Sequence, residues 1–163
     1  MSQSQAPERV GRFLARAVEL SRQGSESGCG GPFGAVVVRG DQIIGEGFNR
    51  VPADNDPTAH AEMVAIRAAC RQIGSFSLAG CEIYASSQPC PMCLAAIYWA
   101  RIERVWFANT VEEARAIGFD DSVFYEQLAL PLERRSIPQV HVPMPEALQV
   151  FRHWAQDPEK VRY

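Results

Sequence analysis

The segments His60-Ala61-Glu62 and Pro89-Cys90-Pro91-Met92-Cys93 decide how this chain is organised. They supply one imidazole, one carboxylate and two thiols, and imidazole and thiolate are the side chains that zinc prefers in proteins. The histidine and the two cysteines make three protein ligands, one fewer than a closed structural zinc site needs. The pattern therefore predicts a zinc site that keeps one coordination position for water, with the glutamate as acid or base beside it.

Hydrophobic periodicity around these segments alternates between helix and strand. A first amphipathic helix is expected over residues 8–23, and a hairpin turn at Gly40-Asp41 joins two β-branched strands. Asp56-Pro57 resembles an N-cap followed by a proline at the first helical position. The expected strands cover 35–38, 42–44, 81–85, 104–108 and 139–142, and the other expected helices cover 56–72, 91–99, 111–117, 122–128 and 145–155.

This order predicts an α/β fold, a three-layer α/β/α sandwich around a central mixed sheet of about five strands. Residues 1–163 contain no repeat or linker, so one domain is expected, preceded by a disordered lead over residues 1–7. Both motif segments open predicted helices, where the helix dipole stabilises thiolates. His60 and Glu62 can then face the same point, while Ala61 leaves room for a substrate.

Composition favours a small-molecule substrate. Sixteen Lys and Arg against nineteen Asp and Glu give a net charge of −3, without the basic surplus expected of a nucleic-acid-binding protein. The apolar stretches are too short to span a bilayer, and the first residues lack the pattern of a signal peptide. Five cysteines, an odd number, suit a reducing cytoplasm better than a disulfide framework. No nucleic-acid or membrane partner is therefore expected.

The alternative is a structural zinc site without catalysis, which needs a fourth protein ligand. Cys29 is the one candidate for that ligand, although Gly30-Gly31 beside it indicates a tight turn. Cys70 and Cys81 are expected to be small core residues.

Further motifs extend the pattern beyond the metal ligands. They are Gly31-Pro32-Phe33-Gly34-Ala35, Asn55-Asp56-Pro57-Thr58-Ala59 before the histidine, the run from Cys93 to Arg101, Ile117-Gly118-Phe119-Asp120-Asp121-Ser122, and a last residue Tyr163. With these, the chain from about Glu8 to Tyr163 resembles the bacterial guanine deaminases of the cytidine-deaminase superfamily.

The resemblance implies a cytidine deaminase-like fold and the hydrolysis of guanine to xanthine and ammonia. It implies one zinc ion per subunit on His60, Cys90 and Cys93. Glu62 would shuttle protons, and Asp121 would contact the departing amino group. The residues implied to bind the purine are Phe33, Asn49, Ala61, Trp99 and Tyr163.

The resemblance also implies a homodimer in which the C-terminal tail, about residues 155–163, crosses to the partner and Tyr163 closes over the base. Without the resemblance, Tyr163 is a frayed terminus. Asp120 and Asp121 are then most simply helix caps.

One position departs from the family. Gln88 stands where the family usually has glutamate, which removes a charge near the predicted thiolates and leaves the ligands themselves unchanged. The motif specifies the reaction rather than the base, so three other activities stay open: guanosine deamination, deamination of another base or nucleoside, and adenosine deamination in transfer RNA. The acidic balance argues against the last.

Overall fold

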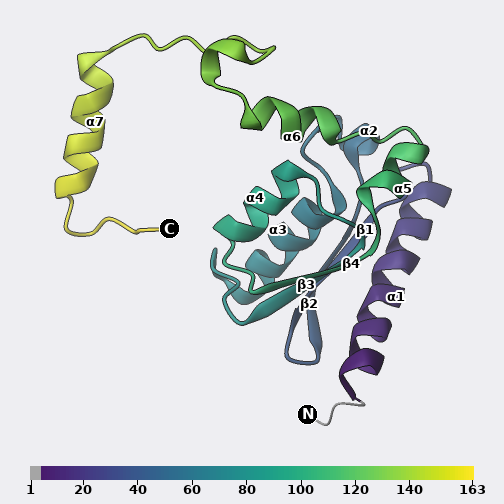
Figure 1. Cartoon of the computed structure of the whole chain (residues 1–163). Helices are drawn as coiled ribbons and strands as arrows, with labels where there is room; N and C mark the ends of the chain where they lie inside the picture. Colours follow the sequence, from purple (N-terminus) through teal and green to yellow (C-terminus); the bar gives the residue numbers. More distant parts are fainter. Residues whose placement is uncertain (1–4) are drawn as a thin grey trace. The chain divides into compact units, whose positions relative to one another are not determined.

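The computed structural model describes residues 5–163, and these fall into two compact units that meet in sequence between Asp121 and Ser122. In the first unit, helices lie on both faces of a sheet (Figure 1). Its elements are α1 (Gln5–Glu26), β1 (Gly34–Arg39), β2 (Gln42–Phe48), α2 (Val51–Asp54), α3 (Ala61–Ile73), β3 (Cys81–Ser87), α4 (Pro91–Trp99), β4 (Arg104–Asn109) and α5 (Val111–Ala116).

The first helix is longer than its periodicity predicts. It begins at Gln5, so residues 5–7 are helical although they were expected to be disordered. Residues 1–4 of that expected lead lie outside the described part of the chain. Pro7 is tolerated because the first N–H groups of a helix have no intrahelical acceptor in any case.

The sheet is mixed and has four strands in the order β2-β1-β3-β4. β1 is antiparallel to both β2 and β3, whereas β3 and β4 are parallel. This confirms the α/β class but not the fifth strand. That strand was expected over residues 139–142, which the structure shows as irregular chain. Pro138 and Pro143 lack the N–H that a strand ladder uses, and they leave only four residues between them.

Alternate residues of β1 enter two separate cores, as the pleat of a strand requires. Val36 and Val38 pack with Phe13, Leu20 and Tyr84 between the sheet and α1, and the rings of Phe13 and Tyr84 have centroids 5.0 Å apart. Their neighbours in β1 face the other way, into the core beneath α3 and α4. That second core comprises Ala35, Val37, Ile44, Ala61, Ala65, Ile66, Ala69, Leu78, Cys81, Ile83, Ala85, Ile97, Ala100 and Ile102.

Two glycines in β2 allow α3 to lie directly on the sheet. A Cβ at Gly45 would come within 2.6 Å of the Ala69 nitrogen, and one at Gly47 within 2.7 Å of the Ala65 nitrogen. Real Cβ atoms do not approach backbone so closely, so a side chain at either position would push the helix outward. The height of α3 above the sheet is therefore set by backbone contact.

The second unit contains α6 (Ser122–Ala129), the 3-10 turn η1 (Leu132–Arg134) and α7 (Pro145–Gln156). The helices predicted over 122–128 and 145–155 are confirmed, but neither buries a residue within this chain. Phe151 and Trp154 on α7 are 75% and 47% exposed. Among residues 5–163, none of the helices has the length and apolar character needed to cross a membrane.

The close contact between β2 and α3 can be tested by adding one methyl group. We expect Gly45→Ala to lower the free energy of unfolding by about 1–3 kcal/mol, because the helix backbone cannot yield without repacking the core. Gly11→Ala is the matched control: it lies within α1 with no atom near its missing Cβ, and should stabilise by about 0.5–1 kcal/mol. Urea unfolding measures both, and an unchanged midpoint for Gly45→Ala would contradict the packing argument.

Candidate metal centre and pocket

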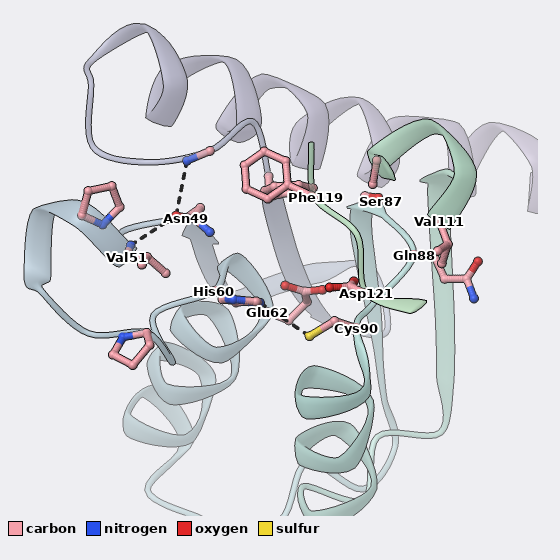
Figure 2. Close-up of a pocket in the computed structure, with 15 residues that line it drawn as sticks. Asn49, Val51, His60, Glu62, Ser87, Gln88, Cys90, Val111, Phe119 and Asp121 are labelled. Atoms are coloured by element: carbon pink, nitrogen blue, oxygen red, sulfur yellow. Dashed lines mark hydrogen bonds between the residues drawn. The ribbon is translucent and has the colours of Figure 1, made fainter. Parts of the chain in front are cut away.

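The two ligand segments open neighbouring helices of the first unit. His60 is the N-cap of α3 and Cys90 the N-cap of α4, and both have the extended backbone usual for that position, with φ of −67° and −66°. Cys93 lies one turn into α4. Because α4 continues the chain from the end of β3, the sheet brings the amino ends of both helices to one side of the molecule, where their dipoles favour negative charge (Figure 2).

The start of the first motif helix differs from the sequence prediction. Asp56 is not its N-cap, because α3 begins only at Ala61. The Asp56 carboxylate instead accepts hydrogen bonds from the Thr58 N–H at 2.8 Å and the Thr58 hydroxyl at 2.7 Å. Asp and Asn form such local turns readily, and this turn occupies the position at which a helix starting at Pro57 would begin.

The geometry of the three predicted ligands fits zinc. Nδ1 of His60 lies 3.6 Å from the sulfur of Cys90 and 3.6 Å from the sulfur of Cys93. Zinc bonds of about 2.0 Å to nitrogen and 2.3 Å to sulfur in a tetrahedron imply nitrogen–sulfur separations of roughly 3.5 Å. Within the described part of the chain, the group of possible ligand atoms found here consists of these three, all within 4.8 Å of one another. Cys29 is not a member.

The two thiols are electrostatically unequal. The pKa of Cys90 is lowered to about 4 because the Cys93 thiol hydrogen-bonds to it and His60 lies close. The same hydrogen bond, together with burial, raises the pKa of Cys93. The pair thus shares one proton, which a divalent cation displaces when both sulfurs become ligands.

Glu62 is a buried carboxyl group, 7% exposed, in the first turn of α3. Burial raises its pKa, since removal from water disfavours the charged form. A carboxyl group with a raised pKa holds a proton more readily than an exposed carboxyl group does, which suits it to proton transfer. Figure 2 shows the Glu62 and Asp121 side chains reaching toward the same space beside the Cys90 sulfur.

That space is a pocket of about 320 Å³. The side chain of Asn49 lies on the pocket wall and has a fixed orientation. Its Oδ1 accepts hydrogen bonds from the Gly31 N–H at 3.3 Å and the Val51 N–H at 3.2 Å. Its amide nitrogen is left as a donor. The lining residues are Gly31, Phe33, Asn49, Val51, Pro52, Pro57, His60, Glu62, Ser87, Gln88, Cys90, Val111, Ala114, Phe119 and Asp121.

Most of the predicted site residues meet in this pocket. Phe33, Asn49 and Asp121 line it together with Glu62 and the ligands His60 and Cys90, while Cys93 is fully buried. The positions of the remaining three are as follows: Ala61 is buried at the start of α3, Trp99 is 66% exposed at the end of α4, and Tyr163 belongs to the second unit.

Trp99 is not among the residues that line the pocket of the first unit. The helix from Pro91 to Trp99 places this ring about two turns from the ligands at its amino end.

Several residues that line the pocket were not predicted from the sequence. Phe119 and Ser87 are both next to residues that were singled out, but neither carries a chemical group with an obvious role. Gln88 was identified as a departure from the family, and its place on the pocket wall was not expected. The one signal in the sequence that could have indicated these lining residues is their closeness to predicted site residues: Phe119 precedes Asp121 by two positions, and Ser87 and Gln88 shortly precede Cys90.

The comparisons with known proteins agree with this geometry. Residues 7–109 match the cytidine and deoxycytidylate deaminase zinc-binding region. The chain is 48% identical to the guanine deaminase of Bacillus subtilis (strain 168) over 151 residues, 93% of this chain and 97% of that protein. The solved structure of Bacillus subtilis guanine deaminase superposes with a TM-score of 0.91 over 94% of this chain and 98% of the other.

More distant relatives share a smaller part of the chain. The tRNA-specific adenosine deaminase of Aquifex aeolicus (strain VF5) is 43% identical over 59% of this chain and 63% of its own length. A structure solved in complex with 2,6-diaminopurine is 32% identical, with a TM-score of 0.64, and covers 67% of this chain and 61% of that one.

Zinc binding can be measured on the purified protein. We expect about one zinc ion per chain, and Cys93→Ser should lose most of it because a hydroxyl group is a far poorer zinc ligand than a thiolate. Cys29→Ser should keep its zinc, since Cys29 is outside the ligand group. Metal analysis by mass spectrometry after dialysis gives the ratio. Loss of zinc from Cys29→Ser would mean that the site is closed by a fourth ligand.

Proposed function

Because this chain belongs to the cytidine and deoxycytidylate deaminase family, we propose that it catalyses the zinc-dependent hydrolysis of guanine to xanthine and ammonia. The observation that carries the substrate assignment is its similarity, over nearly the whole of both chains, to a guanine deaminase. The His60, Cys90 and Cys93 group and the buried Glu62 beside it are the machinery that this reaction requires.

Glu62 is the proposed proton shuttle. Bound zinc would supply an acidified water molecule as the nucleophile. Glu62 accepts a proton from the water that attacks C2 of guanine and delivers it to N3, which gains basicity as the ring loses its conjugation. Glu62 then accepts the remaining proton of the hydroxyl group added at C2 and passes it to the amino nitrogen. The carbon–nitrogen bond breaks as the C2 carbonyl of xanthine forms, and the amino group leaves as ammonia. The raised pKa of Glu62 suits this role, because the same group must bind and release a proton in each turnover.

Asn49 and Phe33 are proposed to hold the base. The fixed Oδ1 of Asn49 directs its amide N–H donors into the pocket, where a purine offers acceptor atoms on its edge. Phe33 provides an aromatic wall for the ring face. Ala61, which has no bulk beyond Cβ, leaves space above the metal centre.

Asp121 is proposed to contact the departing amino group. Burial and the neighbouring Cys90 thiolate raise the pKa of this carboxyl group, while His60 opposes the shift. An acceptor beside the amino nitrogen would align it during cleavage of the carbon–nitrogen bond.

The proposed assembly is a homodimer in which the tail of about residues 155–163 crosses to the partner. The support is that α6 and α7 bury no residue although they carry large apolar side chains. Trp99 and Tyr163 would then complete a pocket, with Tyr163 closing over the base. A cytoplasmic location belongs to the same proposal and fits the five free cysteines.

The substrate assignment is tested by incubating the zinc-loaded protein with guanine, guanosine, cytosine, cytidine and adenine and measuring ammonia. Guanine should react fastest. Faster release from guanosine would replace the proposal with a nucleoside deaminase, and release from none of the compounds would favour a zinc scaffold.

Glu62→Gln keeps the shape of the side chain but removes its proton transfer. We expect kcat for guanine to fall by about 10²–10⁴-fold while zinc content stays the same. Glu46→Gln is the control, because Glu46 is ion-paired with Arg16 and does not line the pocket. Equal ammonia release by Glu62→Gln and the unchanged protein would remove Glu62 from the mechanism.

Deletion of Tyr163 tests the tail. If this residue closes the pocket, kcat/KM for guanine should fall by at least about tenfold, while the urea midpoint should change little because the ring is 72% exposed in the single chain. Parallel losses of activity and stability would instead indicate a structural tail. Sedimentation of the unchanged protein separately measures whether it is a dimer.

A further inference from the structure

Phe119 forms an aromatic pair with the proposed purine wall. Its ring meets that of Phe33 edge to face, with centroids 4.8 Å apart and planes at 89°. This is the arrangement that the charge distribution of aromatic rings favours. Both rings line the pocket, and Phe119 is labelled beside it in Figure 2. Phe119 is 41% exposed and so contributes little to a buried core.

The absence of a side chain at Gly31 makes room for this pair. A Cβ there would come within 2.9 Å of Cζ of Phe119 and 3.1 Å of Cε2 of Phe33. Gly31 also donates its N–H to Oδ1 of Asn49, so its backbone cannot move aside without disturbing that side chain. The two rings therefore pack against the backbone of Gly31, which is held in place by its hydrogen bond to Asn49.

Phe119 also anchors the segment that carries Asp121. Its N–H donates to the carbonyl of Ala114 at 3.1 Å, and Gly118 before it has a positive φ of 96° that turns the chain back after α5. Asp121 follows two residues later and lines the same pocket. The ring contact is thus a side-chain link between the Phe33 wall and the segment bearing this carboxylate.

We propose that Phe119 is a positioning residue. By packing edge to face against Phe33 over Gly31, it fixes the position of the Asp121 carboxylate relative to the Phe33 ring. The role of these two groups toward guanine rests on the proposed function. Phe119 itself transfers no proton. It acts by restricting where the wall and the carboxylate can lie.

Phe119→Ala is the direct test. We expect kcat for guanine to fall by about 10–100-fold through displacement of Asp121, and KM to rise because Phe33 loses its support. Phe119→Leu, which keeps apolar volume, should recover part of both. Ile117→Ala is the matched control, because Ile117 is in the same segment, is 59% exposed and does not line the pocket. Values of kcat and KM for Phe119→Ala within twofold of the unchanged protein would overturn the proposal.

A double-substitution cycle tests the contact between the Phe119 ring and Gly31. Gly31→Ala should impair turnover in the unchanged protein and impair it less in the Phe119→Ala background, where the closest clash is removed. Equal effects of Gly31→Ala in both backgrounds would contradict the proposed contact.

Hydrogen exchange gives a readout that does not depend on the substrate. The amides of residues 117–119 donate to carbonyls of α5, and their protection should fall in Phe119→Ala but not in the Ile117 control. Unchanged protection would overturn the positioning role even if guanine is the substrate. If the unchanged protein released no ammonia from guanine, the proposed function would fail while this measurement still decided the role of Phe119.

Discussion

The amino ends of α3 and α4 must meet at one point, and the arrangement of the rest of the first unit depends on that requirement. Gly45 and Gly47 set how closely α3 lies on β2, and β3 delivers Cys90 directly to the start of α4. A shift of either helix by one residue would rotate its ligand by about 100° and separate sulfur from imidazole. The sheet therefore serves chiefly to fix the relative height and rotation of two helices.

This arrangement also places a buried carboxyl group, that of Glu62, beside the metal centre. Burying a carboxyl group such as Glu62 costs stability unless it is protonated or paired. The same burial raises the pKa of this carboxyl group, which favours its holding a proton that it can pass on. A site that functions in this way is expected to be less stable than an apolar core of the same volume.

The sequence predicted the zinc ligands from the chemistry and spacing of their side chains, and the pocket residues Phe33, Asn49 and Asp121 only through the family resemblance. His60, Cys90 and Cys93 meet at the predicted spacing, and Phe33, Asn49 and Asp121 line the same pocket. Prediction from the sequence failed where a role depends on packing or local competition. The Asp56 carboxylate accepts a hydrogen bond from Thr58 instead of capping a helix. Residues 139–142 form no strand in this chain. The contact between Phe119 and Phe33 joins residues far apart in sequence, which no hydrophobic periodicity could have predicted.

Because His60 belongs to the start of α3 and both cysteines to α4, a metal ion at this centre is a cross-link between two helices. Anything that binds only the folded chain raises its resistance to unfolding, by about 1.4 kcal/mol for each tenfold increase in free ligand above the dissociation constant. The melting temperature of this protein is therefore a function of available zinc. Withdrawal of the metal would remove this contribution to the free energy of unfolding and leave the two helices joined by their packing on the sheet alone.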